Sequence, residues 1–252
     1  MTDTILKIDG LVKHFGGLVA TDHAHLDVKA GSVHALIGPN GAGKTTLIHQ
    51  MSGALRSDAG RIVFNGTDVT TVPMHLRAQA GLVRSYQITS IFRKFSVLDN
   101  LALAVQARSG SSMRIWSPAS AERARFDESA ALAARVGLAG REYTLAGSLS
   151  HGEQRQLELG IALATRPKLL LLDEPMAGMG PDESARMVEL LLELRQESTL
   201  LLVEHDMDAV FKLADTISVL VFGKVIASGN ADAIRNNPDV KRAYLGDEVD
   251  AH

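Results

Sequence analysis

The sequence predicts an α/β protein with a mainly parallel sheet, into which a helical segment is inserted. From Lys168 onward, short apolar runs alternate with stretches of helical spacing, and this alternation is typical of a parallel sheet covered by helices. Residues 88–165 show no comparable strand pattern. The length of 252 residues suits one large domain or a domain with an inserted lobe. We therefore expect a single domain over residues 1–252, with a core from residues 1–87 and 166–252 and a helical subdomain from residues 88–165.

The first part of the chain is predicted to form short strands separated by turns. Apolar and polar residues alternate in short runs, with glycine-containing pairs between the runs. One stretch has instead helical spacing, which predicts a helix from near Lys44 to about Ser52. The expected strands are Ile5–Ile8, Leu11–Phe15, Ala24–Val28, Arg61–Phe64 and Leu82–Tyr86, and the expected turns lie at Asp9-Gly10, Gly16-Gly17 and Asn65-Gly66.

Helices are predicted for the middle of the chain. From Lys168 onward, the predicted helices alternate with predicted strands. Residues 109–119 contain Gly, Ser and Pro and predict a break that forms a surface insert. The leucine run Leu169–Leu172 fits a central strand that is buried on both faces. The expected helices are Asp99–Ala107, Ala119–Val136, His151–Ala164, Pro181–Glu197 and Met207–Ala214, and the expected strands are Leu169–Asp173, Leu200–Glu204 and Thr216–Phe222.

Composition and charge argue against several classes of protein. A formal net charge of −3 gives no basic surplus to neutralise phosphates, so we expect no nucleic-acid partner. The chain has no cysteine, so it forms neither a disulfide nor a thiolate metal site, as suits a reducing compartment. The N-terminus lacks the basic region and apolar core of a signal peptide. The longest apolar runs are too short to span a bilayer, so a membrane role requires a partner.

A glycine-rich segment directly after the apolar run Val33–Ile37 carries the clearest chemical signal. It reads G-P-N-G-A-G-K-T-T and matches the phosphate-binding loop pattern G-x-x-x-x-G-K-[ST], which predicts a site for a nucleoside triphosphate with Mg²⁺. Backbone N–H groups and the start of the following helix would face the phosphates, Lys44 would reach the β- and γ-phosphates, and Thr45 would ligate Mg²⁺. The alternative is a glycine-rich turn with a chance lysine. The residues of the predicted loop are Gly38, Pro39, Asn40, Gly41, Ala42, Gly43, Lys44, Thr45 and Thr46.

Two carboxylates, Asp173 and Glu174, follow the leucine run. Ligands bind at the carboxyl ends of the strands in open α/β sheets. Asp173 can therefore hold the Mg²⁺ shell, and Glu174 can polarise an attacking water. Alone, the pair is equally compatible with an acidic strand end before a turn at Pro175. Together with the phosphate-binding loop, it favours a hydrolytic site.

The segment L-S-H-G-E-Q, just before the leucine run, has two interpretations. Ser150 followed three residues later by Glu153 is the pattern of a capping box, which by itself indicates only a well-capped helix. The functional interpretation is a second helix start that binds an anion through the Ser150 hydroxyl and the Gly152 N–H group.

The motifs in this order resemble the ATP-binding-cassette (ABC) ATPases over nearly the whole chain. The resemblance implies a P-loop NTPase core, an N-terminal antiparallel β subdomain and an inserted helical subdomain. It implies ATP hydrolysis with Mg²⁺ by two cassettes that face each other head to tail, so that Ser150 and Gly152 contact the ATP of the partner subunit. It rests on Gly38–Thr46, Gln87, Leu149–Glu153, Leu170–Pro175 and His205.

The resemblance also assigns roles to single residues. It implies that Glu174 is the catalytic base and that His205 is the γ-phosphate switch. Gln87 would contact Mg²⁺ and water and couple to the helical subdomain, and Phe15 would stack on adenine. Plainer interpretations exist for three of them: Phe15 as core filling, Gln87 as a polar residue at a strand end, and His205 as a surface histidine.

Some positions depart from the family pattern. The signature usually reads L-S-G-G-Q, and here His151 and Glu153 replace a glycine and the glutamine, while Ser150 and Gly152 are retained. Gly180 stands where the family often has an aspartate.

Further stretches resemble the ATP-binding subunits of bacterial branched-chain amino acid importers. That resemblance implies a peripheral subunit at the cytoplasmic face of the inner membrane. Its partners would be a second ATPase subunit, two transmembrane permeases and, indirectly, a periplasmic solute-binding protein. Urea or short-amide importers and lipopolysaccharide-export ATPases share much of the pattern and are the alternatives. The stretches are Phe15–Leu18, Ser90–Phe92, Val203–Met207, Ile234–Gly246 and the insert at 109–119.

Two classes of function outside transport compete with this interpretation. A soluble cassette ATPase of translation or DNA repair usually has two cassettes in one chain, or long coiled-coil or zinc inserts, and this sequence shows neither. A nucleotide-dependent scaffold without turnover is disfavoured because Lys44, Asp173, Glu174 and His205 are all present.

Overall fold

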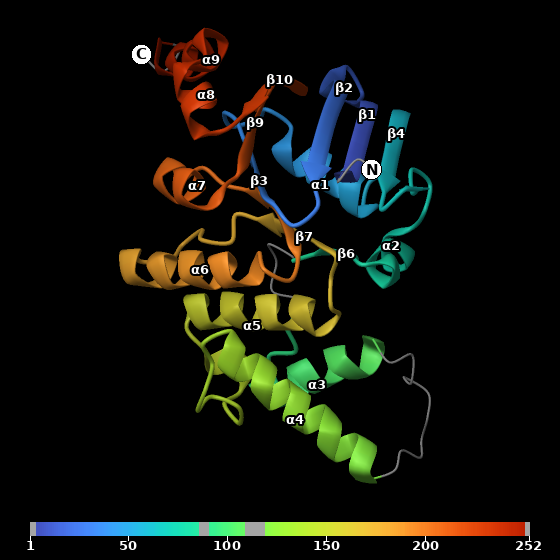
Figure 1. Cartoon of the computed structure of the whole chain (residues 1–252), viewed down its shortest axis with the longest axis vertical. Helices are drawn as coiled ribbons and strands as arrows, with labels where there is room; N and C mark the ends of the chain where they lie inside the picture. Colours follow the sequence, from blue (N-terminus) through green and yellow to red (C-terminus); the bar gives the residue numbers. More distant parts are fainter. Residues whose placement is uncertain (1–3, 86–90, 109–118, 250–252) are drawn as a thin grey trace.

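A computed structural model of the chain describes residues 4–85, 91–108 and 119–249. Within these ranges the strands form two sheets, and helices α3, α4 and α5 lie at the end of the molecule away from the antiparallel sheet (Figure 1). The first sheet is antiparallel, with strand order β2-β1-β4-β5. Its strands are β1 (Thr4–Phe15), β2 (Leu18–Lys29), β4 (Ala59–Phe64) and β5 (Thr67–Asp68).

The second sheet has strand order β10-β9-β3-β8-β7-β6. Neighbouring strands from β9 to β6 are parallel, and β10 pairs with β9 in the antiparallel direction. This confirms the predicted α/β class with a mainly parallel sheet. The strands are β3 (Val33–Ile37), β6 (Leu82–Arg84), β7 (Leu169–Asp173), β8 (Thr199–Val203), β9 (Thr216–Val221) and β10 (Lys224–Gly229).

The parallel sheet is covered on both faces. Leu171 and Leu201 face a core shared with α1 and the antiparallel sheet. Leu170 and Leu172 face a second core, shared with α5 and α6. Because successive side chains of a strand point to opposite faces, the run of leucines fills both cores at once. This packing fixes the position of the carboxylates that follow.

The helices of the described residues are distributed around and beyond this sheet (Figure 1). Helices α3, α4 and α5 contact one another and form the helical end of the molecule. The exact division into a core and a helical subdomain at residues 88–165 stays a prediction. The helices are α1 (Lys44–Ser52), α2 (Met74–Ala80), α3 (Val97–Arg108), α4 (Ala119–Arg135), α5 (His151–Ala164), α6 (Pro181–Leu194), α7 (Met207–Leu213), α8 (Ala231–Asn236) and α9 (Pro238–Val249).

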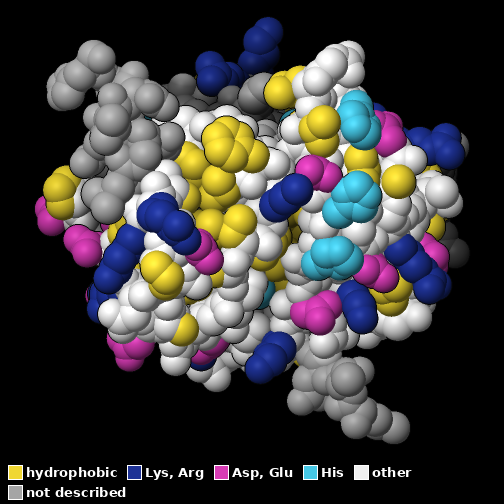
Figure 2. All heavy atoms as spheres, turned by 90° about the horizontal axis from the view of Figure 1, so that it is seen from above, with side chains coloured by type: hydrophobic (Ala, Val, Ile, Leu, Met, Phe, Trp, Pro, Cys, Tyr) yellow, Lys and Arg dark blue, Asp and Glu magenta, His cyan; other side chains and the backbone are white. Residues whose placement is uncertain are grey.

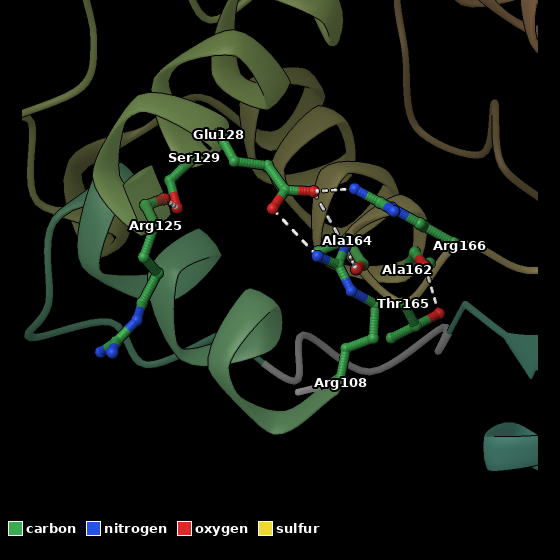
Figure 3. A network of polar contacts seen from close by, with 8 residues as sticks. All are labelled: Arg108, Arg125, Glu128, Ser129, Ala162, Ala164, Thr165 and Arg166. Atoms are coloured by element: carbon green, nitrogen blue, oxygen red, sulfur yellow. Dashed lines mark hydrogen bonds and ion pairs between the residues drawn. The ribbon is translucent and has the colours of Figure 1, made fainter. Parts of the chain in front are cut away.

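An ion-pair network joins the helices of this end (Figure 3). Both terminal nitrogens of Arg108, on α3, donate to the two carboxylate oxygens of Glu128, on α4, at 2.9 Å each. Arg166, which follows α5, donates to Glu128 at 3.0 Å. Arg108 also donates to the Ala164 carbonyl at 2.7 Å. The network therefore ties the ends of α3 and α5 to the middle of α4.

One predicted turn is wrong. The chain does not reverse at Asp9-Gly10, because β1 continues through it as far as Phe15. The register of β1 with β2 shifts between Ile8 and Leu11, and Gly10 adopts a φ of 61°. An irregularity of this kind absorbs extra residues within a strand that is paired on both sides. The turns at Gly16-Gly17 and Asn65-Gly66 are present.

Several elements were not anticipated from the sequence: α2, β5, β10, α8 and α9. Most are short, and β10 is an edge strand with an alternating exposed face. Helix α6 ends at Leu194, earlier than the expected Glu197. The segment 109–118 and the end of the strand expected to reach Tyr86 lie outside the described residues. Within the described part of the chain, no helix is both long and apolar enough to cross a bilayer.

The antiparallel sheet exposes histidines beside carboxylates on its outer surface. The Nδ1 atoms of His23 and His25 lie 2.7 and 3.0 Å from carboxylate oxygens of Asp22 and Asp9. Figure 2 shows histidine side chains next to acidic ones on this face of the molecule. Such exposed pairs contribute little to stability.

Candidate nucleotide-binding site

The predicted phosphate-binding loop lies at the carboxyl end of β3 and leads directly into α1. Gly43 is the N-cap residue of α1, with a φ of 101°, and no side chain caps this helix start. A Cβ atom at Gly43 would lie 2.2 Å from the Ala20 carbonyl oxygen, so only glycine fits between the loop and β2. The first N–H groups of a helix have no partner within the helix. An uncapped start of this kind is suited to bind phosphate.

Lys44 folds back across the loop. Its Nζ atom donates hydrogen bonds to the carbonyl oxygens of Gly38, at 2.6 Å, and Pro39, at 2.9 Å. Burial lowers the pKa of Lys44, and the negative charges of Glu174 and Asp173 act in the opposite direction. The lysine therefore lies within electrostatic reach of both carboxylates that the sequence assigned to the site.

Asp173 is the last residue of β7, and it is paired with a residue of the neighbouring strand. Nη2 of Arg84, at the end of β6, donates to Oδ2 of Asp173 at 2.8 Å. The side chains of Arg84 and Asp173 are only 5% and 1% exposed. Arg84 belongs to none of the motifs and was not predicted as a site residue. The available signal was an arginine at the end of an apolar strand whose parallel neighbour ends in aspartate.

Glu174 leaves the strand with a φ of 48°, a region that non-glycine residues seldom adopt. Its backbone N–H donates to the Val203 carbonyl at 2.9 Å, which ties it to the end of β8. His205 follows that strand, and its Nδ1 atom lies 3.9 Å from Oε1 of Glu174. This distance is longer than a hydrogen bond. The fold thus brings Glu174 and His205 close together without a direct hydrogen bond between these two atoms.

Glu204 is a site component that sequence analysis missed. Its side chain is 1% exposed and accepts hydrogen bonds from the backbone N–H groups of Met176, at 3.0 Å, and His205, at 3.2 Å. Burial raises the pKa of Glu204, while these backbone hydrogen bonds oppose the rise. Glu204 therefore fastens the His205 loop to the segment after Glu174. A carboxylate directly after an apolar strand was the signal for it.

Ser150 caps α5 in the predicted capping box. The Ser150 hydroxyl accepts from the Glu153 N–H at 3.2 Å, and a Glu153 carboxylate oxygen accepts from the Ser150 N–H at 2.9 Å. A Cβ atom at Gly152 would lie 2.7 Å from a carboxylate oxygen of Glu183, at the start of α6. Helix α5 packs on the face of the sheet opposite α1. The fold therefore places Ser150 and Gly152 on the other side of the sheet from their own phosphate-binding helix.

The remaining predicted residues are placed as follows. Phe15 ends β1 with half of its surface exposed, so it does not fill the core. The Nζ atom of Lys13 lies 5.6 Å from the centre of its ring. Thr45 is exposed and Thr46 is half-buried in the first turn of α1. Gln87 lies outside the described residues.

The residues present fit a nucleotide with Mg²⁺. Among the described residues, Oδ1 of Asp173 has no hydrogen-bond donor, because Arg84 occupies Oδ2. The exposed Thr45 hydroxyl follows Lys44 on the same helix start. Magnesium prefers such oxygen ligands, and the uncapped glycine loop suits phosphate.

Comparison with known proteins decides the family. The family model described as "ABC transporter" matches residues 21–177. This chain belongs to the ABC transporter family. A second model, described as "Branched-chain amino acid ATP-binding cassette transporter", matches residues 224–250 of this ABC protein. The predicted subtype is confirmed by the full-length relatives that follow.

Full-length relatives and solved structures agree with this assignment. The ABC protein is 37% identical to the high-affinity branched-chain amino acid transport ATP-binding protein LivG of Escherichia coli, over 98% of this chain and 100% of LivG. It is 32% identical to the lipopolysaccharide export ATP-binding protein LptB of Haemophilus influenzae, over 97% of this chain and 98% of LptB. The ADP conformation of MJ1267, an ATP-binding cassette of an ABC transporter, matches 96% of this chain and 99% of its own, with a TM-score of 0.83 and 30% identity. The predicted ABC ATPase fold is thereby confirmed.

Proposed function

We propose that this ABC ATPase is the ATP-hydrolysing subunit of an importer for branched-chain amino acids. The observation that carries the enzymatic part is the convergence of Lys44, Asp173, Glu174 and His205 at the carboxyl ends of β3, β7 and β8. The cargo rests on the match of residues 224–250 and on the likeness to LivG.

Each residue of the site would have a separate role in ATP hydrolysis. The loop from Gly38 to Thr46 and the start of α1 bind the phosphates, and Lys44 exchanges its contacts with the loop carbonyls for contacts with phosphate oxygens. Glu174 orients the attacking water and accepts its proton. His205, 3.9 Å from Glu174, contacts the γ-phosphate side. Phe15 offers an exposed ring for stacking on adenine.

Thr45, Asp173 and Gln87 would hold Mg²⁺. When bound, the ion neutralises charge that develops on the phosphate oxygens. The rigid end of β7 keeps Asp173 in place for this role, because the strand is buried along its whole length.

A complete site would require a second subunit. In this chain, Ser150 and Gly152 lie across the sheet from α1, where they cannot serve the nucleotide of their own loop. We propose that they contact the ATP of a second cassette, a copy or a paralogue. The pair of cassettes would sit at the cytoplasmic face of the bacterial inner membrane. There the segment 88–165 would act on two transmembrane permeases. A periplasmic solute-binding protein would deliver the solute to these permeases.

Reconstitution tests the cargo. The chain is purified from membranes together with the permeases that copurify with it, and the complex is inserted into liposomes. ATP is supplied inside, and radiolabelled solute with its binding protein is supplied outside. ATP-dependent uptake of leucine, isoleucine or valine is the expected result. Uptake of urea or short amides instead would indicate a urea or amide importer. Extraction of lipopolysaccharide by the copurified permeases would indicate an export ATPase. Copurification without any hydrophobic permease would contradict the transport role itself.

A further inference from the structure

A buried ion pair joins the ends of two neighbouring strands at the proposed Mg²⁺ site. Arg84 ends β6 and Asp173 ends β7, and the pairing of these strands sets Arg84 beside Leu171. The guanidinium can therefore reach forward along β7 to the carboxylate, at 2.8 Å. Both side chains are at least 95% buried. No other residue of the described chain shares a hydrogen bond with this carboxylate.

Stability alone is a poor reason for such a pair. Removing two charges from water is costly, and apolar residues of similar volume are often as stabilising as a buried ion pair. The strands that carry the pair are apolar up to this point, since Leu82 and Val83 precede Arg84 in β6 and four leucines precede Asp173 in β7. The presence of the charged pair at the acidic end of the catalytic strand therefore points to a role in the site.

The pairing is also asymmetric. Arg84 occupies Oδ2 of Asp173, and Oδ1 has no hydrogen-bond donor within the described residues. The Asp173 charge acts on Lys44 of the phosphate-binding loop, and the charges of Arg84 and Asp173 both act on His49 of α1. Asp173 alternates along β7 with Leu172 and so lies on the same face of the sheet as Leu171, which packs in the core shared with α1.

We propose that Arg84 is a positioning residue for magnesium: it fixes Oδ2 of Asp173, so that the carboxylate is held in one orientation and Oδ1 is available to the Mg²⁺ shell. This inference rests on the proposed function, because it concerns the same Mg–ATP site. Arg84 and the metal use different oxygens and act together. Partners that orient a metal ligand typically change metal affinity by about 10- to 100-fold when they are removed.

The test measures metal dependence without turnover. A fluorescent, non-hydrolysable ATP analogue is bound to the full chain at increasing Mg²⁺, and again in EDTA. For Arg84→Gln we expect the Mg²⁺ concentration at half-maximal binding to rise at least about tenfold, with binding in EDTA unchanged. Arg84→Lys keeps the charge but not the planar fork, so its midpoint should lie between those of wild type and Arg84→Gln.

Arg108→Gln is the matched control, because Arg108 also makes an arginine–carboxylate pair, with Glu128 at 2.9 Å, but in the helical end of the molecule. It should leave the Mg²⁺ midpoint at the wild-type value. Circular dichroism confirms that each variant is folded before titration, and Arg84→Lys carries the test if Arg84→Gln fails to fold.

Two results would overturn the positioning role. An unchanged midpoint in folded Arg84 variants would mean that the pair is structural, even if their melting temperatures fall. A lowered midpoint would mean that Arg84 competes with the metal. If wild type itself showed no Mg²⁺-dependent nucleotide binding, the proposed ATPase function would fail, and that outcome is distinct from both.

Discussion

Replacement of the buried histidine His34 by glutamine should remove a large part of the sensitivity of this protein to acid. His34 lies on β3 with 1% of its surface exposed, and its Nε2 atom is 2.8 Å from the Ser218 hydroxyl on β9. That hydroxyl lies 2.7 Å from the Ser228 hydroxyl on β10. Burial lowers the pKa of His34 to about 4, from 6.5 in an exposed histidine. The folded protein therefore keeps this ring neutral in mild acid.

The sign of the effect follows from proton binding. Between the two pKa values the unfolded chain binds a proton at His34 and the folded chain does not. Unfolding is therefore favoured as the pH falls below 6.5, until the folded protein also takes up the proton near pH 4. Each pH unit in this window costs about 1.4 kcal/mol. Acidification from about pH 7 to about pH 5 should reduce the free energy of unfolding by about 2 kcal/mol through this residue alone.

The assay is urea unfolding of the nucleotide-free chain, followed by circular dichroism at about pH 7 and about pH 5. Glutamine carries an amide close to the position of Nε2, so it can still bond to Ser218, and it does not titrate. The loss of stability on acidification should be about 2 kcal/mol smaller in His34→Gln than in wild type. His75→Gln is the control, because His75 is exposed on α2. Equal acid sensitivity of His34→Gln and wild type would refute the reasoning.

Three further substitutions test the site and the core. Glu174→Gln should bind ATP normally but lose about 10²- to 10⁴-fold in hydrolysis, because the general base is removed; wild-type phosphate release would show that Glu174 is not the base. Lys44→Ala should lose nucleotide affinity, measured by fluorescence titration, and unchanged binding would undermine the phosphate-loop assignment. Arg77 is 2% exposed and donates to the carbonyl oxygens of Gln50, Met51, Val72 and Thr70. Arg77→Gln leaves several of these acceptors without a donor, so urea unfolding should show that the free energy of unfolding falls by about 2–4 kcal/mol. In the control Arg61→Gln, at an exposed position, it should fall by less than about 1 kcal/mol.

Local sequence patterns were sufficient to predict the strand that ends at the site and the helices that begin there. The run Leu169–Leu172 is apolar enough to identify a strand buried on both faces, and the structure buries each of its residues. The glycines and Lys44 occur at the spacing that a strand–loop–helix transition requires, and α1 begins at Lys44. Ser150 and Glu153 are three residues apart, so the capping box could be predicted from short-range chemistry, and it is present.

Long-range contacts could not be predicted in this way. A glycine after Asp9 looks like a turn, but pairing of β1 with strands on both sides turns it into an irregularity within a longer strand. Short edge elements such as β10 depend on neighbours for stability, so their own sequences give little signal.

The sequence by itself determined the chemistry of this protein: a phosphate-binding loop, an acidic strand end and a signature segment, in the order of an ABC ATPase. These motifs are contiguous, and each depends on the conformation of only a few residues. The tertiary structure decided which side chains act on one another. It paired Arg84 with Asp173 and let the Glu204 carboxylate accept from the His205 N–H group. It also left Phe15 exposed at the surface and placed Ser150 across the sheet from the phosphate-binding helix. Such contacts arise only when strands distant in the chain pair in register, because burial makes an unpaired charge costly and so selects its partner.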